Sequence, residues 1–237
     1  SRTTRWQYDV ADQLLQVIAP SGRTLRYTYD ARGQQQTITD SLGNTISFGY
    51  DNRSNAATLS DQRGNITAFT YDELFRLTGQ RDSLGRLITL EYDSVGNVIA
   101  QTDRLGRRTT ISYDNINRPI TVNYADATAN YGYDSAGRLM SASDASGAIT
   151  WQYDNANRVT AEVTNLGTVS YGYNNANQRT TMTAADRPPV TYGYDSAGRL
   201  QTISQTTGGV TELFTYGYDA LSRRTQLQRQ ANGAGIV

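Results

Sequence analysis

The side chains of this sequence that could take part in chemistry are carboxylates, arginines and tyrosines, because its 237 residues include no His and no Cys. A Ser-His-Asp arrangement, a Cys-His pair and a zinc site of His and Cys are therefore excluded by composition. The absence of Cys also excludes disulfides without identifying a compartment. Because 22 basic residues balance 22 acidic ones, we expect no basic surface of the kind that binds nucleic acid.

Aspartates could act in pairs in glycoside cleavage, or they could bind calcium. Many of them directly follow a tyrosine and precede a turn sequence, so a role in turns accounts for them. Calcium-binding solenoids use Gly-Gly-x-Gly-x-Asp nonapeptides, and this sequence has none. We therefore expect no catalytic residue, no metal site and no cofactor.

The tyrosine-aspartate pair recurs at a nearly fixed interval. It begins at residues 8, 29, 50, 71, 92, 113, 133, 153, 194 and 218, with a Tyr-Asn variant at 173. The interval is 20 or 21 residues, and 24 for the last copy. Self-similarity at a fixed period predicts a repeat array. We predict a single array over residues 1–237, with eleven repeats at about 6–229 and a frayed tail at about 230–237.

Each repeat contains two corners of the Asp-x-x-Gly type, as at 30–33 and 40–43. The Asp carboxylate can accept a hydrogen bond from the backbone two residues on, while Gly tolerates positive φ. Only six or seven residues separate successive corners, which is a strand length and too short for a helix. One repeat is therefore predicted to be one β-hairpin, and the chain to be an all-β antiparallel array of about 22 strands.

The structural signature of the repeat is the Tyr, the Asp, the Gly four residues after the Tyr and, in two copies, the following Arg. These residues are Tyr8, Asp9, Tyr29, Asp30, Gly33, Tyr50, Asp51, Tyr71, Asp72, Tyr92, Asp93, Gly96, Tyr113, Asp114, Tyr133, Asp134, Gly137, Arg138, Tyr153, Asp154, Tyr173, Tyr194, Asp195, Gly198, Arg199, Tyr218 and Asp219. Asp12, Ser54, Phe75 and Ser222 replace the Gly or Asn usual at the fourth position. Because a bulky side chain is unfavourable at positive φ, we expect the corner at Phe75 to use a different turn.

The strand that enters each tyrosine alternates with period two, as in Ile46, Phe48 and Tyr50 with polar residues between them. One face of the sheet should therefore be aromatic and aliphatic, and the other polar. The strand that leaves each corner is less clearly patterned, and its faces are not assigned. The Pro188-Pro189 pair cannot donate ladder hydrogen bonds and should lie in a loop or at an edge.

About 22 strands at roughly 4.8 Å each would make a sheet on the order of 100 Å wide, and twisted open sheets rarely exceed about 10 strands without curling. This predicts a hollow spiral, a shell or a shell segment. A β-propeller would need blades of two repeats, but odd and even repeats do not differ. A solenoid of aromatic hairpins that binds cell-wall ligands would need Trp-rich cages, and only Trp6 and Trp151 exist.

Arginine recurs five residues after the tyrosine, at Arg76, Arg118, Arg138, Arg158, Arg199 and Arg223. A row of arginines could bind an anionic glycan or an enclosed cargo. We favour the simpler interpretation that each caps a solvated corner or lies over a neighbouring tyrosine ring. Rows of tyrosines could likewise stack against sugars, although they are more often part of a core.

The motif Tyr-Asp-Ser-Ala-Gly-Arg-Leu stands at 133–139 and again at 194–200. With the period, it resembles the YD repeats of Rhs proteins, of the cocoon-forming subunits of bacterial insecticidal toxin complexes, of wall-associated toxins and of teneurins. The resemblance covers residues 6–229. It implies a β-sheet that spirals into a hollow shell and encloses a toxin or effector domain of the same or an associated polypeptide. With no catalytic residue expected, we predict a non-enzymatic structural domain.

The resemblance also implies a bacterial protein that is exported or displayed at the cell surface as part of a larger chain. No Asp-Pro-x-Gly motif that would close the shell, no delivery domain and no toxin domain are recognisable, so we expect an internal segment. There is no signal peptide and no run of 18 apolar residues that could span a membrane. The alternative function is that of a surface adhesin or carbohydrate-binding module, with glycans as partners.

Overall fold

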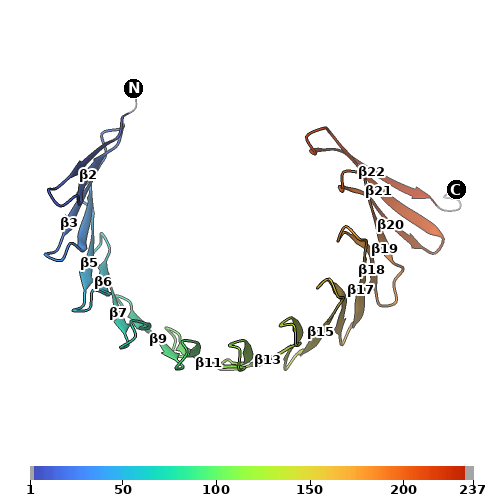
Figure 1. Cartoon of the computed structure of the whole chain (residues 1–237), viewed down its shortest axis with the longest axis horizontal. Helices are drawn as coiled ribbons and strands as arrows, with labels where there is room; N and C mark the ends of the chain where they lie inside the picture. Colours follow the sequence, from blue (N-terminus) through green and yellow to red (C-terminus); the bar gives the residue numbers. More distant parts are fainter. Residues whose placement is uncertain (1–2, 233–237) are drawn as a thin grey trace. The chain divides into compact units, whose positions relative to one another are not determined.

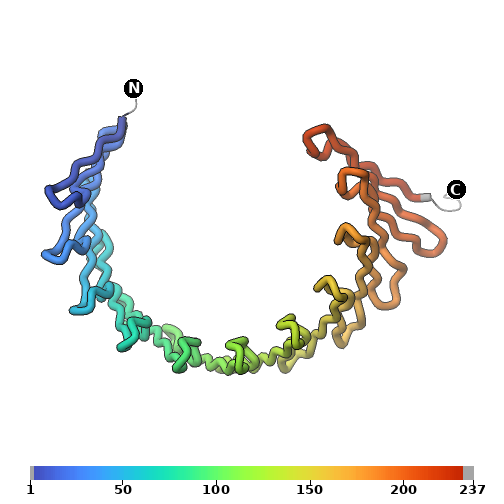
Figure 2. The backbone as a smooth tube through the Cα atoms, in the orientation of Figure 1, coloured from blue at the N-terminus to red at the C-terminus, as the bar shows by residue number. Residues whose placement is uncertain are grey.

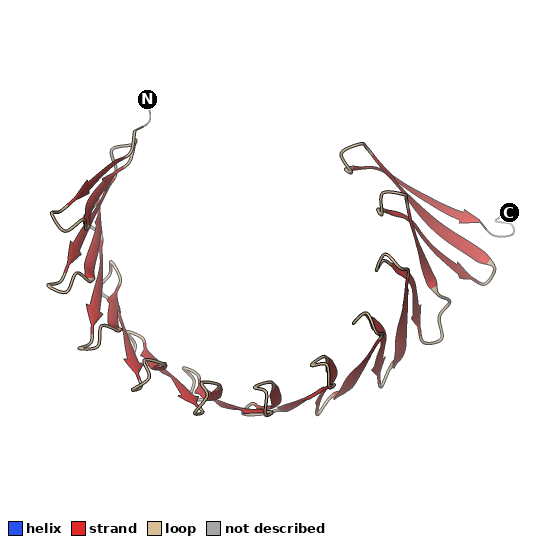
Figure 3. Ribbon diagram, viewed as in Figure 1, coloured by secondary structure: helices blue, strands red, loops and turns tan. Residues whose placement is uncertain are grey.

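The computed structural model describes residues 3–232, which consist of strands and turns without a helix (Figure 3). The chain forms two compact units, Ser1–Asp126 and Ala127–Val237. The predicted all-β class is confirmed, and the described residues contain 22 strands. Strand β22 continues to Asn232, whereas residues 233–237, where most of the predicted tail falls, lie outside the described residues. That residues 1–237 form a single array stays a prediction.

Twelve strands lie in the first unit (Figure 1). They are β1 (Arg5–Tyr8), β2 (Leu14–Ile18), β3 (Thr24–Tyr29), β4 (Gln35–Asp40), β5 (Thr45–Tyr50), β6 (Ala56–Ser60), β7 (Ile66–Tyr71), β8 (Leu77–Arg81), β9 (Leu87–Tyr92), β10 (Val98–Thr102), β11 (Arg108–Tyr113) and β12 (Pro119–Asn123).

Ten strands lie in the second unit. They are β13 (Thr128–Tyr133), β14 (Leu139–Asp144), β15 (Gly147–Tyr153), β16 (Val159–Thr164), β17 (Gly167–Tyr173), β18 (Arg179–Ala184), β19 (Val190–Tyr194), β20 (Leu200–Thr207), β21 (Val210–Tyr218) and β22 (Arg224–Asn232).

Within each unit, every strand pairs antiparallel with the strand before it and the strand after it. Inside a unit, the described strands contact only these sequence neighbours. Pairing is not interrupted after every fourth strand, which excludes propeller blades in either unit. Taken by itself, each unit also bends along the direction from strand to strand (Figure 2).

The Tyr-Asp corners share one turn geometry, which the corner of β3 and β4 illustrates. The Asp30 N–H donates to the Gln34 carbonyl at 2.8 Å, and the Gly33 N–H donates to the Asp30 carbonyl at 3.0 Å. Asp30 Oδ1 accepts hydrogen bonds from the backbone N–H groups of Arg32 and Gln34 at 2.8 and 2.9 Å. This is a type I turn followed by a left-handed residue, a common hairpin closure. The ladder register shifts just before Tyr29.

The expectation of a different turn at Phe75 is wrong. Phe75 has a φ of +63°, and its N–H donates to the Asp72 carbonyl at 3.2 Å as in the other corners. The fourth position has positive φ in all eleven copies, including those with Asp12, Ser54 and Ser222. Two contacts offset the unfavourable backbone conformation at Phe75: the Asp72 carboxylate holds the turn, and the Arg53 guanidinium lies 5.8 Å from the Phe75 ring centroid.

The two faces of each sheet differ as predicted, and the register now assigns the leaving strand as well. Ile38 lies opposite Ile46, and Leu59 lies opposite Phe48, so both belong to the aromatic face. The other face carries Thr, Ser and Gly, with cross-strand hydroxyl pairs at 2.6–2.9 Å. These pairs are Thr28–Thr37, Thr39–Thr45 and Thr191–Ser204.

Neither face is covered by a second layer. Among the residues that the structure describes, only Gly79, Ala100 and Ala161 are buried, and the two alanines are 2% and 6% exposed. The chain exposes 16081 Å², whereas a compact protein of this size would expose roughly 10,500 Å². Each unit is therefore a single-layered sheet whose side chains are half-buried against their neighbours, and strand-to-strand contacts must supply its stability.

Strands β18 and β19 form the shortest ladder within the second unit. Only Thr181↔Thr191 and Met182↔Val190 are paired, because the loop 185–189, with its two prolines, interrupts the strands as predicted. Hydrogen bonds to the flanking strands β17 and β20 hold the loop in place. The Ala185 N–H donates to the Thr168 carbonyl at 2.8 Å, and Gln205 Nε2 donates to the Pro188 carbonyl at 2.8 Å.

We expect the amides that bond across the β18–β19 ladder to exchange with solvent faster than those that bond across the β16–β17 ladder. The β16–β17 ladder pairs four residues on each strand against two, and fewer ladder bonds lower the free energy of local opening. Hydrogen exchange followed by mass spectrometry measures both ladders in one sample. Equal protection of the two ladders would contradict this assignment of the weakest junction.

Candidate functional site

The residues of the predicted signature gather at one end of the hairpins, in the Tyr-Asp turns. Asp154 shows how each carboxylate is used. Its Oδ1 accepts the backbone N–H groups of Ala156 and Arg158 at 2.9 and 3.0 Å, and its Oδ2 accepts Nε of Arg158 at 2.7 Å. The backbone N–H of Arg158, followed by its side chain, lowers the pKa of Asp154 against the opposing effect of desolvation. The carboxylate is fully engaged by its own turn.

The same arginine also reaches into the next repeat. Nη1 of Arg158 donates to the Asn174 carbonyl at 2.9 Å and to Oδ1 of Asn177 at 3.0 Å. Its guanidinium carbon lies 4.8 Å from the ring centroid of Tyr173. One side chain therefore joins the Asp of its own turn to the Tyr and the backbone of the following turn. We call this arrangement the clasp.

Four arginines form the clasp within the units. Arg76, Arg138 and Arg199 repeat the geometry of Arg158, with guanidinium carbons 4.6, 4.7 and 4.7 Å from the rings of Tyr92, Tyr153 and Tyr218. The side chains of these four arginines are 25–29% exposed, whereas Arg223, bonded to its own Asp219, is 75% exposed. The prediction that these arginines cap a corner or lie over a neighbouring tyrosine is confirmed.

Shorter amides stand in for arginine in other repeats. Gln178 Nε2 donates to the Gly198 carbonyl at 2.8 Å, and Asn97 Nδ2 donates to Oδ1 of Asn117 at 2.8 Å. Gln34 Nε2 reaches the Ser54 carbonyl at 3.4 Å, while its Oε1 is buried without a hydrogen bond. These amides bridge successive turns without a cation over the ring, so the coupling is chemically weaker in those repeats.

The tyrosine hydroxyls make a second connection between repeats. Tyr153 Oη donates to the Leu139 carbonyl at 2.7 Å. Leu139 begins β14, two residues before Ser141, where pairing of β14 with β15 starts. The neighbouring strand therefore leaves this carbonyl unpaired, and the hydroxyl takes its place in the ladder.

The same bond recurs along both units at 2.7–3.0 Å. The tyrosines and their acceptor carbonyls are Tyr29 with Leu14, Tyr50 with Gln35, Tyr71 with Ala56, Tyr92 with Leu77, Tyr113 with Val98, Tyr173 with Val159, Tyr194 with Arg179 and Tyr218 with Leu200. These acceptors are not predicted from the sequence. A signal was present, because the position is Tyr in all eleven repeats and never Phe, although Phe occurs two residues earlier in two of them.

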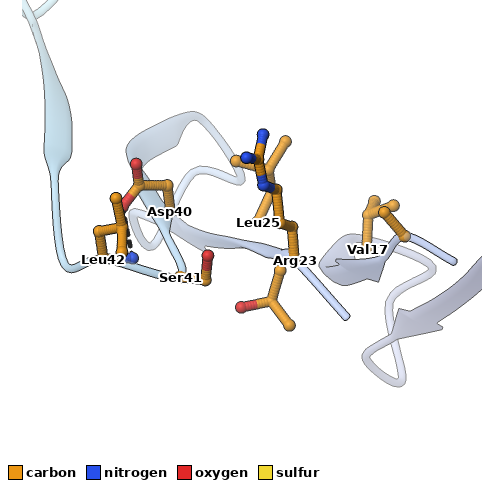
Figure 4. A pocket seen from close by; sticks show the side chains of 8 residues that line it. Val17, Arg23, Leu25, Asp40, Ser41 and Leu42 are labelled. Atoms are coloured by element: carbon orange, nitrogen blue, oxygen red, sulfur yellow. Dashed lines mark hydrogen bonds between the residues drawn. The ribbon is translucent and has the colours of Figure 1, made fainter. Parts of the chain in front are cut away.

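The opposite hairpin ends carry grooves but no reactive set of side chains. The groove in Figure 4 has a volume of about 480 Å³ and lies between the corners that follow β2 and β4. Its one carboxylate, Asp40, accepts the N–H groups of Leu42 and Asn44 and the amide of Asn44 at 2.8–2.9 Å. The Asn44 side chain is the main cause of a lowered Asp40 pKa. The other polar side chains that line this groove are those of Arg23, Thr24 and Ser41.

Among residues 3–232, no three His, Cys, Asp or Glu side chains lie close enough to hold a metal ion. None of the described residues belongs to a helix that is long and apolar enough to cross a membrane.

Comparison with known families gives two matches. The model of the Teneurin YD-shell matches residues 85–232, and the model of the RHS Repeat matches residues 8–45. Together they cover most of the chain. No curated protein matches the sequence.

Solved structures of toxin complexes share the fold. The crystal structure of TcdB2-TccC3-Cdc42 matches with a TM-score of 0.55 and 18% identity over 98% of this chain and 15% of that one. The crystal structure of TcdB2-TccC3 has a TM-score of 0.54, with the same identity and coverage. The Photorhabdus luminescens Tc holotoxin pore has a TM-score of 0.53 and 18% identity, over 98% and 14%. The chain thus spans about a seventh of the length of these proteins.

Replacing Tyr153 by Phe removes only the hydroxyl that satisfies the Leu139 carbonyl. We expect Tyr153→Phe to lower the free energy of unfolding by about 1 kcal/mol, because a partly buried acceptor loses its hydrogen bond while the ring stays under Arg138. Urea denaturation followed by circular dichroism measures the difference.

Tyr8→Phe is the matched control, since Tyr8 is 57% exposed and its hydroxyl has no acceptor within residues 3–232. Its unfolding midpoint should stay within error of that of the parent chain. If both variants were equally stable, the hydroxyl would have no part in joining the repeats.

Proposed function

This chain belongs to the Teneurin YD-shell family, and we propose that its hairpins form part of the wall of a hollow shell that encloses a toxin or effector polypeptide. The chain is a structural repeat domain of that family and resembles the toxin complexes in fold. Enclosure, the enclosed partner, and export or display at a cell surface are our proposals. So is the absence of catalytic activity in this segment.

The observation that carries the proposal is the single-layered sheet. A wall needs a continuous surface with two sides, and both faces of each unit stay half exposed, with only Gly79, Ala100 and Ala161 buried among the described residues. An ordinary globular domain would instead bury one face in a core. The excess of exposed surface over a compact protein of this size supports a wall that other parts of a larger assembly cover.

The disposition of the tyrosine rings supports the wall over a carbohydrate-binding module. A sugar site would need rings open to solvent, whereas the rings of Tyr92, Tyr153, Tyr173 and Tyr218 lie under arginines of the preceding repeats. Their hydroxyls are bonded to backbone carbonyls as well. These tyrosines join hairpins and leave little ring surface for a ligand.

Proteolysis of the full-length protein tests the proposal. We expect a polypeptide segment outside the repeats to resist proteinase K in the intact protein, and to be digested in the double variant Arg138→Ala/Arg158→Ala, in which two adjacent clasps are broken. Mass spectrometry identifies the protected segment and follows its rate of loss.

Arg26→Ala is the matched control, because Arg26 is exposed and takes part in no clasp. It should leave the protection unchanged. Digestion of every segment outside the repeats at the same rate in all three proteins would contradict enclosure. Binding to a glycan array that is lost in Tyr192→Ala and Tyr216→Ala would favour the carbohydrate-binding alternative.

A further inference from the structure

A row of aromatic side chains runs along the aromatic face of the second unit. Each stands two residues before the tyrosine of a turn, and the members are Tyr131, Trp151, Tyr171, Tyr192 and Tyr216. Successive members are two strands apart, so the gaps between neighbouring rings measure about 10 Å. A gap of this width accommodates one planar cation between two rings.

The chain fills one of these gaps itself. The guanidinium carbon of Arg179 lies 5.7 Å from the ring centroid of Tyr171 and 4.7 Å from that of Tyr192. Beside it, Met182 lies next to Tyr192, with its sulfur 3.9 Å from the hydroxyl. Arg179 therefore occupies the gap between two aromatic rings as an internal cation.

The preceding gap, between Trp151 and Tyr171, contains an acidic side chain and no internal cation. Val159 stands where the next repeat has Arg179, and Glu162 stands where it has Met182, each twenty residues earlier. Glu162 lies directly opposite Trp151 in the β15–β16 ladder. Its Oε2 accepts the hydroxyl of Tyr171 at 3.2 Å. No basic side chain among residues 3–232 forms an ion pair with Glu162.

We propose that the gap between Trp151 and Tyr171 binds the guanidinium group of an arginine side chain from another polypeptide. The two rings supply cation–π contacts, and the carboxylate of Glu162 supplies a charged acceptor for its N–H groups. A planar guanidinium can stack against both rings, whereas the compact ammonium group of lysine cannot. The site is independent of the enclosure proposed above.

The surroundings permit a second cation beside Arg179. The two gaps are one ring spacing apart, about 10 Å, a separation at which solvent and salt screen exposed charges. Desolvation and the nearby Glu162 raise the pKa of Tyr171, so its hydroxyl stays a neutral donor to the carboxylate. Trp151, Glu162 and Tyr171 are only half-buried, so part of each side chain is accessible from solvent.

Tryptophan fluorescence tests the site in the intact chain. The variant Trp6→Phe leaves Trp151 as the sole tryptophan, and N-acetyl-arginine amide is the probe. We expect a saturable change in Trp151 emission with this probe and none with N-acetyl-citrulline amide, which has the same shape without the charge. No response to arginine, or an equal response to citrulline, would overturn the proposal.

Two further variants on the Trp6→Phe background separate the site from nonspecific quenching. Glu162→Gln keeps the side-chain shape and should weaken binding at least fivefold. Val159→Arg should abolish the response by filling the gap from within, as Arg179 fills the next one. Leu200→Arg is the control, because it places arginine at the same repeat position one gap beyond Arg179 and should leave binding unchanged. A full response in Glu162→Gln would refute the site even if Val159→Arg did not fold.

Discussion

The rest of the structure depends on contacts that join successive turns, which are the clasp at four junctions within the units and side-chain amides at others. Because each sheet is one layer thick and only two alanines and one glycine are buried among the described residues, no hydrophobic core holds the hairpins together. A hairpin alone is marginally stable in water, so it must be fixed to its neighbours. Arg158 does this by bonding Asp154 in its own turn while covering Tyr173 and bonding the backbone in the next. Stability of this kind is a sum over neighbouring pairs.

This dependence explains why the repeat varies in some positions and not in others. The left-handed position accepts Gly, Asn, Asp, Ser and even Phe, because the Asp carboxylate and the neighbouring turn hold the backbone in place. The tyrosine is never replaced, since its hydroxyl takes the place of a ladder donor at a carbonyl such as that of Leu139. The polar face varies among Thr, Ser and Gly, because small side chains are enough to fit between neighbouring strands there.

The hairpin array can be predicted from the sequence, because the turn residues and the alternation of apolar residues along a strand are local properties. The sequence predicts the number of strands, the two faces and the stacking of arginine on tyrosine, but the prediction fails at Phe75, where an intrinsic φ preference yields to the Asp72 carboxylate and Arg53. The acceptor of each tyrosine hydroxyl lies 14 to 18 residues earlier and becomes visible only from the register. Likewise, only the strand register shows that Glu162 and Met182 occupy equivalent positions opposite an aromatic ring.

A double-mutant cycle between Arg158 and Tyr173 tests the clasp most directly. The free energies of unfolding of Arg158→Ala, Tyr173→Leu and the double variant should show a coupling of about 0.5–1 kcal/mol. The same cycle between Arg158 and Tyr218, three turns further on, should be additive within about 0.3–0.5 kcal/mol. Additivity in both cycles would mean that the arginine contributes nothing across the repeat boundary, and the account of a sheet held by its turns would fail.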